Sequence, residues 1–257
     1  MGIMGDRYVT SQTHIMPVTV VTGVILMEDS IVPINNSVAK SFQLTKNGNT
    51  IITTIAEQLI IDDIFNTTNL IKDIPIFIDK YIPIKYNKLV SRFHPSAKDT
   101  LTIDNAGGKS EISEALSINY LSERFKANTF ILEMQIEYWI RNYKMCDYIC
   151  IINGQRIDVS VTRAMGFPTA DDFNEESAYN LLKKKMHGLV IARTGVCTKH
   201  EFSTSILHVW CQSQRIAELL KNAYPRIISE DDSESVYEVI VLLSVCDKSY
   251  IYTNKEE

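Results

Sequence analysis

The chain has 257 residues, enough for one large domain or two modest ones, and its 45% hydrophobic and 22% charged residues are typical of a globular protein. Its net charge of −5 gives no overall attraction to nucleic acid, so any such contact needs a local basic patch. Apolar runs are too short to span a membrane, and the N-terminus lacks the features of a signal peptide. An odd number of dispersed cysteines favours reduced thiols and an intracellular location, in cytoplasm or nucleus.

The first hundred residues predict a β-rich lobe. Residues 18–27 (VTVVTGVILM) are typical of a strand, and residues 41–55 of a hairpin that turns at its Asn-Gly-Asn sequence. The apolar spacing of residues 56–71 favours a short helix, and the proline-containing residues 74–84 favour extended edge strands or loops. Because this lobe carries no recognisable chemistry, we expect it to be structural or to bind a protein partner.

The composition changes between residues 94 and 109, where Pro, Ser, Asp, Asn and a Gly-Gly pair predict an exposed loop. We place a domain boundary there, with the β-rich lobe at residues 1–100 and a second domain at residues 108–257. The loop ends in Gly-Gly-Lys-Ser, which is similar to the end of a phosphate-binding loop. The full motif needs a glycine at position 103, where this chain has Ile103, so only the end of the motif is present.

The second part of the chain predicts helix, three strands, helix, strand, helix and strand. Asn174 is expected to cap the second helix, which should end near Gly188, and Pro225 should stop the third. This order predicts an α/β (α+β) fold, in which helices flank a mixed sheet. The predicted helices cover residues 109–127, 174–192 and 213–224, and the predicted strands cover residues 129–140, 146–152, 156–162, 205–212 and 236–245.

The stretch CDYICIINGQRIDVSV, residues 146–161, predicts a hairpin with a carboxylate on each arm. Asn153-Gly154 is a strong signal for a two-residue turn. Residues two apart in a strand share a face, so Asp158 lies on a polar stripe with Ser160 and Thr162, while Asp147 opens the first strand. The expected pairing places Asp147 a few residues beyond Asp158 along the hairpin.

A third acid, Glu114, lies on the preceding helix. Its spacing with Ile118, Leu121 and Phe125 places it on the core-facing stripe. A carboxylate there is costly unless it is paired, hydrogen-bonded or bound to a metal. Three acids that converge from a helix and a hairpin predict a site for a divalent cation with oxygen ligands, as Mg²⁺ prefers.

Over residues 109–224 this arrangement resembles the PD-(D/E)xK restriction-endonuclease-like nucleases. Glu114 resembles the helix glutamate of that family, Asp147 the acid that opens its second core strand, and Asp158 the acid of its third strand. The resemblance implies that these residues are catalytic, that they ligate Mg²⁺, and that the protein hydrolyses phosphodiester bonds of nucleic acid.

The chain departs from the family at the third strand, where Ser160 replaces the family's lysine. Lys184 or a neighbour in the Lys183–Lys185 run is the candidate replacement, and Arg163, Lys183 and Arg215 are candidate contacts for nucleic acid. A catalytically inactive scaffold or interaction protein with this fold is equally compatible with the departure. A small-molecule enzyme on an unrelated α/β fold is a third hypothesis.

Plainer interpretations of the same residues stay open. Asp147 can simply start a strand, Asp158 can face solvent, and Glu114 can pair with Arg124. A zinc site is a further alternative, although residues 208 and 211 fall on opposite faces of a regular strand. Its four ligands would be Cys197, His200, His208 and Cys211.

Overall fold

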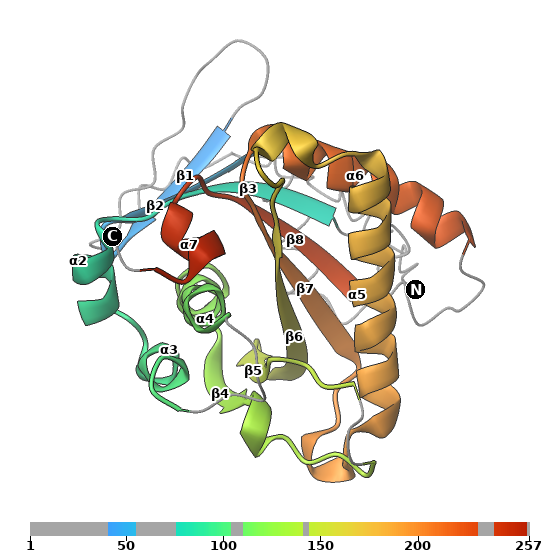
Figure 1. Cartoon of the computed structure of the whole chain (residues 1–257). Coiled ribbons are helices and arrows are strands. Elements are labelled where there is room, and N and C mark those ends of the chain that lie inside the picture. The colour runs from blue at the N-terminus through green and yellow to red at the C-terminus, as the bar shows by residue number, and fades with distance from the viewer. Residues whose placement is uncertain (1–40, 55–75, 104–109, 141–143, 231–238, 256–257) are drawn as a thin grey trace, which may run out of the picture.

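The computed structural model describes residues 41–54, 76–103, 110–140, 144–230 and 239–255. They form an eight-stranded mixed sheet with helices on both faces, which confirms the predicted fold class (Figure 1). The strand order is β1-β2-β3-β8-β7-β6-β5-β4. Strands β3, β8, β7 and β6 are parallel neighbours, and the pairs at both ends of the sheet are antiparallel.

The elements follow the chain in this way. The strands are β1 (Ser41–Lys46), β2 (Asn49–Thr54), β3 (Ile76–Ile82), β4 (Asn128–Leu132), β5 (Tyr148–Ile152), β6 (Gln155–Ala164), β7 (Thr204–Cys211) and β8 (Val239–Val245). The helices are α2 (Tyr86–Ser91), α3 (Pro95–Thr100), α4 (Glu111–Phe125), α5 (Glu175–Gly195), α6 (Gln214–Glu230) and α7 (Ser249–Thr253). Three short 3₁₀ turns are η1 (Glu133–Gln135), η2 (Ala170–Asp172) and η3 (Thr198–His200).

Alternation along the central strands divides the core into two layers. In β7, Ile206 and Trp210 pack with α2, α3, α4 and α7 on one face of the sheet. Leu207 and Val209 pack with α5 and α6 on the other. Both faces of β7 and β8 are buried, which is the ordinary condition of parallel strands covered by helices on each side.

Both predicted hairpin turns are present. Asn47-Gly48 joins β1 to β2, and Asn153-Gly154 joins β5 to β6. All four residues have positive φ, between 48° and 86°, the conformation that a type I′ turn requires and that Asn-Gly tolerates best. Ile149 lies opposite Asp158, so the register agrees with the predicted one to within a residue.

The proline-containing segment is not an edge strand, and that prediction was wrong. Strand β3 pairs with β2 on one side and with β8 on the other, and its Phe77 and Tyr81 are buried in the core. The sheet therefore runs across the predicted boundary at residues 94–109, and the described parts on its two sides share one sheet and one core layer. The predicted strand at residues 18–27 and helix at residues 56–71 lie outside the described residues.

Two helices continue past the residues predicted to end them. Helix α5 passes Gly188 and ends at Gly195, and α6 contains Pro225 and ends at Glu230. In each helix an apolar stripe packs against the sheet on both sides of the breaking residue, and this packing offsets a cost of about 1 kcal/mol for glycine and about 3 kcal/mol for proline. Conversely, the strand predicted at residues 129–140 ends at Leu132, where η1 begins.

Candidate active site

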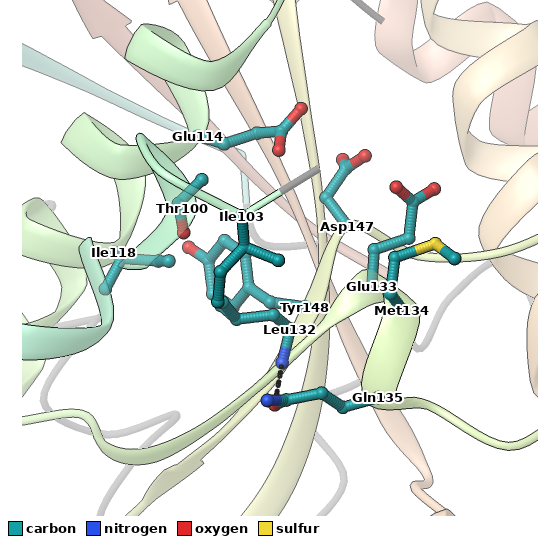
Figure 2. Close-up of a pocket in the computed structure, with 10 residues that line it drawn as sticks. All are labelled: Thr100, Ile103, Glu114, Ile118, Leu132, Glu133, Met134, Gln135, Asp147 and Tyr148. Carbon is teal, nitrogen blue, oxygen red and sulfur yellow. Dashed lines mark hydrogen bonds between the residues drawn. The ribbon is translucent and has the colours of Figure 1, made fainter. Parts of the chain in front are cut away.

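A small cavity opens between α3, α4 and the chain that joins β4 to β5 (Figure 2). Its walls are mostly apolar, and carboxylates gather at one side. Figure 2 shows the Glu114 and Asp147 side chains reaching toward the same region, with Glu133 beside Asp147. The lining residues are Thr100, Ile103, Glu114, Ile118, Leu132, Glu133, Met134, Gln135, Asp147 and Tyr148.

Glu114 lies in the first turn of α4, where its negative charge complements the positive end of the helix dipole. Its main-chain N–H donates to the carbonyl of Ser110 (3.0 Å), and the Ser110 hydroxyl donates to its carboxylate. The side chain is only 8% exposed. Burial first, and then the negative charge of Asp147, raise the pKa of Glu114 to about 7, against the lowering effect of the Ser110 hydrogen bond.

Asp147 immediately precedes β5. Its main-chain N–H donates to the carbonyl of Val159 (2.9 Å), which continues the β5–β6 ladder by one residue. Its carboxylate accepts hydrogen bonds from the main-chain N–H of Val161 and from the hydroxyl of Ser160 (3.2 Å). Burial raises the pKa of Asp147, and the two hydrogen bonds and the positive charge of Lys185 oppose that change.

Asp158 lies on the other side of the sheet. Its neighbours in β6, Val159 and Ile157, belong to the core layer beneath α4, so Asp158 points toward α5 and Arg193. It is fully buried, and burial raises its pKa to about 7. Ser205 and Arg193 lie close enough to lower that pKa, but neither carboxylate oxygen makes a hydrogen bond of normal geometry among the described residues.

The predicted three-acid site is therefore not assembled. Glu114 and Asp147 meet at the cavity, but Asp158 is not among the residues that line it. Within the parts of the chain that the structure describes, no three or more His, Cys, Asp or Glu side chains are arranged to hold a metal ion. The physical reason is strand alternation: Ile157 and Val159 pack in the core layer beneath α4, so the side chain of Asp158 between them points to the other face of the sheet.

One residue near the acid pair, Glu133, was missed at the sequence level, and the Lys183–Lys185 run was predicted with Lys184 or a neighbour as the candidate. Glu133 follows β4 at once, and its charge helps to raise the pKa of Glu114. Of the three consecutive lysines, Lys185 is the one whose charge acts on Asp147, whereas Lys184 is exposed. The helical phase of the buried residue Met186 could have placed Lys185 nearer to the sheet, but no local signal marks the end of β4.

The three predicted nucleic-acid contacts are all engaged within the protein. Arg163 donates to the carbonyls of Ile251 and Tyr252 (3.4 and 3.2 Å). Lys183 donates to the Tyr179 hydroxyl (2.6 Å) and approaches Glu230, and Arg215 donates to the carbonyl of Phe173 (3.0 Å). Each of these cations is therefore hydrogen-bonded to another part of the protein.

The zinc alternative does not assemble either. His208 is fully buried between the hydroxyls of Ser117 (2.7 Å) and Ser244 (2.9 Å), and burial lowers its pKa to about 3. Cys211 lies in the core layer on the opposite face of the sheet. His200 accepts a hydrogen bond from the main-chain N–H of Glu137 (2.9 Å). The Gly-Gly-Lys stretch lies outside the described residues.

Comparison with known proteins gives little guidance on chemistry. No protein-family model and no solved structure matches the chain. The chain is 31% identical over 158 residues to the AAC-rich mRNA clone AAC4 protein of Dictyostelium discoideum. The match covers 59% of this chain and 23% of that protein, so the chain spans about a quarter of the length of this relative.

Proposed function

We propose that the Glu114–Asp147 cavity is the site of metal-dependent hydrolysis of phosphodiester bonds in nucleic acid. The observation that carries the proposal is the meeting of a helix acid and a strand-opening acid at one cavity, where the negative charge of Asp147 adds to burial in raising the pKa of Glu114. The arrangement of α4, β4, β5, β6, α5 and β7 supports it. These elements follow one another as helix, three strands, helix and strand, which is the order on which the resemblance to restriction-endonuclease-like nucleases rests.

The donor set fits a small magnesium site. Mg²⁺ is commonly held by one or two carboxylates together with water and substrate phosphates, so the carboxylates of Glu114 and Asp147 are enough protein ligands for such a site. Two carboxylates that share a largely buried site repel each other, and after burial the charge of Asp147 is the next cause of the raised pKa of Glu114. When bound, a divalent cation would offset this repulsion, polarise the phosphodiester and promote ionisation of a water molecule.

The side chains around the pair have separate roles in this proposal. Two hydrogen bonds from β6 hold the Asp147 carboxylate, so its orientation is set before substrate binds. Ser110 holds the Glu114 carboxylate in the same way. Lys185 supplies positive charge near Asp147. In the proposal it takes the role of the family's third-strand lysine, whose position is occupied by Ser160 in this chain. The sequence predicts Lys184 or a neighbour for this role, and the proposal assigns it to Lys185.

The proposal predicts Mg²⁺-dependent cleavage of nucleic acid by the intact chain. We expect Asp147→Asn and Glu114→Gln to lower the cleavage rate by roughly 10³-fold, because each removes one of the two candidate ligands. The measurement is the single-turnover rate on single- and double-stranded DNA and RNA. Glu218→Gln, at an exposed carboxylate on α6, is the matched control and should cleave like the wild type.

A second readout does not depend on catalysis. Mg²⁺ should raise the melting temperature of the wild type but not of Glu114→Gln, because a ligand that binds only the folded state stabilises it. Protons compete with the metal for Glu114, whose pKa is about 7, so the increase should be larger at pH 8 than at pH 6. An equal increase in the variant and the wild type would show that the metal binds elsewhere.

The alternative function is a non-catalytic scaffold or interaction protein with the same fold. Two observations favour it: Ser160 occupies the β6 position next to Asp147, and Asp158 is turned toward Arg193. In that case neither cleavage nor a Mg²⁺-dependent rise in melting temperature would be observed.

An intracellular location belongs to the same proposal. All five cysteines are free and four of them are buried, as expected of a reducing compartment. None of the helices in the described ranges is long and apolar enough to cross a membrane.

A further inference from the structure

Positive charge is concentrated on one part of this acidic chain. The net charge is −5, yet the sequence from Lys85 to Lys98 contains four basic residues and no acidic one. These residues belong to α2, α3 and their flanking turns, and Lys248 lies across a depression from Lys85. We call this set the α2–α3 basic surface: Lys85, Lys88, Arg92, Lys98 and Lys248.

The fold turns these cations outward. Helix α2 packs Tyr86 and Leu89 into the core, and Phe93 follows them on the same side. Lys85, Lys88 and Arg92 have the spacing i, i+3, i+7, which places them on one adjoining stripe, and all three are exposed. One guanidinium nitrogen of Arg92 donates a hydrogen bond to the carbonyl of Asn47 (2.7 Å), and the guanidinium has further N–H donors for a ligand.

A depression of about 730 Å³ lies at one end of this surface. Lys85, Asn87 and Lys248 line it, together with the buried rings of Tyr86 and Tyr250, whose centroids are 4.9 Å apart. Lys248 is 3.8 Å from the exposed carboxylate of Asp247, which screens it in part. Two ammonium groups and an amide around an open depression are suited to phosphate oxygens.

The other end of the surface reaches the candidate active site. Lys98 lies on α3, where its ammonium group donates to the carbonyl of Ser91 at the end of α2 (3.2 Å). Thr100, two residues later, lines the cavity that contains Glu114 and Asp147. In Figure 1, α2 and α3 follow one another along the outer left edge of the molecule, on the side where α4 and α7 lie.

We propose that the α2–α3 basic surface binds the phosphate backbone of nucleic acid and leads the strand to the Glu114–Asp147 cavity. This inference rests on the proposed function and assigns its binding surface. Without a bound metal the two carboxylates repel a phosphodiester, so cations outside the cavity have to supply the attraction that holds the substrate in that state. Lysine and arginine contacts to phosphate supply most of the sequence-independent affinity for nucleic acid. Lys85 and Lys248 line the depression at one end of the surface, and Lys98 at the other end lies two residues before Thr100 of the cavity, with the exposed Asp99 between them.

The test is binding in EDTA, where cleavage does not occur. Fluorescence anisotropy would measure the affinity of the intact chain for a 5′-labelled single-stranded DNA of about 30 nucleotides, between about 50 and 200 mM salt. The double variant Lys85→Gln/Lys88→Gln is compared with Lys221→Gln/Arg226→Gln, which removes the same charge from α6 on the opposite face of the sheet. We expect the α2 variant to bind about tenfold more weakly. The slope of log K against log salt concentration should become shallower by about 1.4, because each lost phosphate contact to a single strand contributes about 0.7 to that slope. The α6 variant should match the wild type.

Failure of this inference can be told apart from failure of the proposed function. If the α2 variant binds like the wild type with an unchanged salt dependence, the surface assignment is overturned, and Mg²⁺-dependent cleavage still decides the function. If binding depends on Lys85 and Lys88 but no metal supports cleavage, the surface stands and the hydrolytic function fails. Competition by poly-glutamate as effective as by unlabelled DNA would overturn the assignment to nucleic acid. Lys88→Glu, a single charge reversal, should weaken binding more than Lys88→Gln, and equal affinities of these two variants would also count against it.

Discussion

Asp79→Ala is expected to lower the free energy of unfolding by about 3 to 5 kcal/mol, because it removes one partner of a buried ion pair. Asp79 is fully buried on β3 and accepts hydrogen bonds from the Tyr120 hydroxyl and from Nε of Arg124 (3.3 Å). The Arg124 side chain is only 3% exposed. The alanine variant leaves the arginine buried without this negative charge, and it also removes the partner of the tyrosine hydroxyl.

The measurement is denaturant unfolding of wild type, both single variants and the double variant Asp79→Ala/Arg124→Met. Because the two residues are in contact, we expect the double variant to lose clearly less than the sum of the two single losses. Simple additivity would show that Asp79 and Arg124 do not stabilise each other. The pair joins β3 to α4, so a large coupling would also show that the strand from the predicted N-terminal lobe is part of the same folding unit as the candidate active site.

Asp158→Asn is expected to raise the free energy of unfolding at pH 8 by about 2 to 4 kcal/mol. The pKa of Asp158 in the folded protein is about 7, against an ordinary value of 3.8. Between these two values the folded state keeps a proton that the unfolded state releases, so wild-type stability falls as the pH rises toward 7. The full cost is present above pH 7 and corresponds to about 4 kcal/mol. The buried amide also needs hydrogen-bond partners, and this reduces the gain.

Unfolding at pH 5, 6.5 and 8 checks this prediction. The gain from Asp158→Asn should be small at pH 5 and should grow to its full size at pH 8. Asp171→Asn, at an exposed aspartate, should change the stability little at any pH. A gain that does not depend on pH would contradict the assignment of a buried, proton-binding carboxyl.

The same variant separates two assignments of the active site. If the cavity acts through Glu114 and Asp147, Asp158→Asn should keep the Mg²⁺-dependent cleavage activity of the wild type. The sequence alone predicts the opposite result, because it places Asp158 among the metal ligands. If Asp158→Asn is folded and more stable than the wild type but no longer cleaves nucleic acid, Asp158 is a catalytic residue after all.

Local patterns in the sequence were sufficient for many of the elements. The two Asn-Gly turns, the Asn174 cap and the alternation of Ile157, Asp158 and Val159 are short-range features, and the structure contains all of them. Boundaries were less predictable. Helices α5 and α6 pass through Gly188 and Pro225 because long-range packing against the sheet outweighs the local preference to stop.

The candidate site was only partly predictable. The sequence identified Glu114 and Asp147, because an acid on an apolar helical stripe and an acid that opens a strand are both visible in a linear pattern. It could not show that Ser160 is the β6 residue bonded to Asp147, because that depends on pairing between strands. Nor could it show that Lys185 approaches Asp147 while Lys183 is bound to Tyr179, because helix α5 is positioned by its tertiary packing.

The sequence by itself determined the order of the elements from α4 to β8, the hairpin register to within a residue and two of the acids at the cavity, because these follow from the periodicities of helix and strand and from turn chemistry. It did not predict α2, α3 or α7, and α3 lies within the segment expected to be an exposed loop. Only the tertiary structure decided that β3 lies inside the sheet, that Asp158 faces Arg193 rather than the cavity, and that Thr100 of α3 lines the same cavity as the acid pair. Strand order and the packing of helices on each face bring together residues that are far apart in the chain, and no local pattern encodes those contacts.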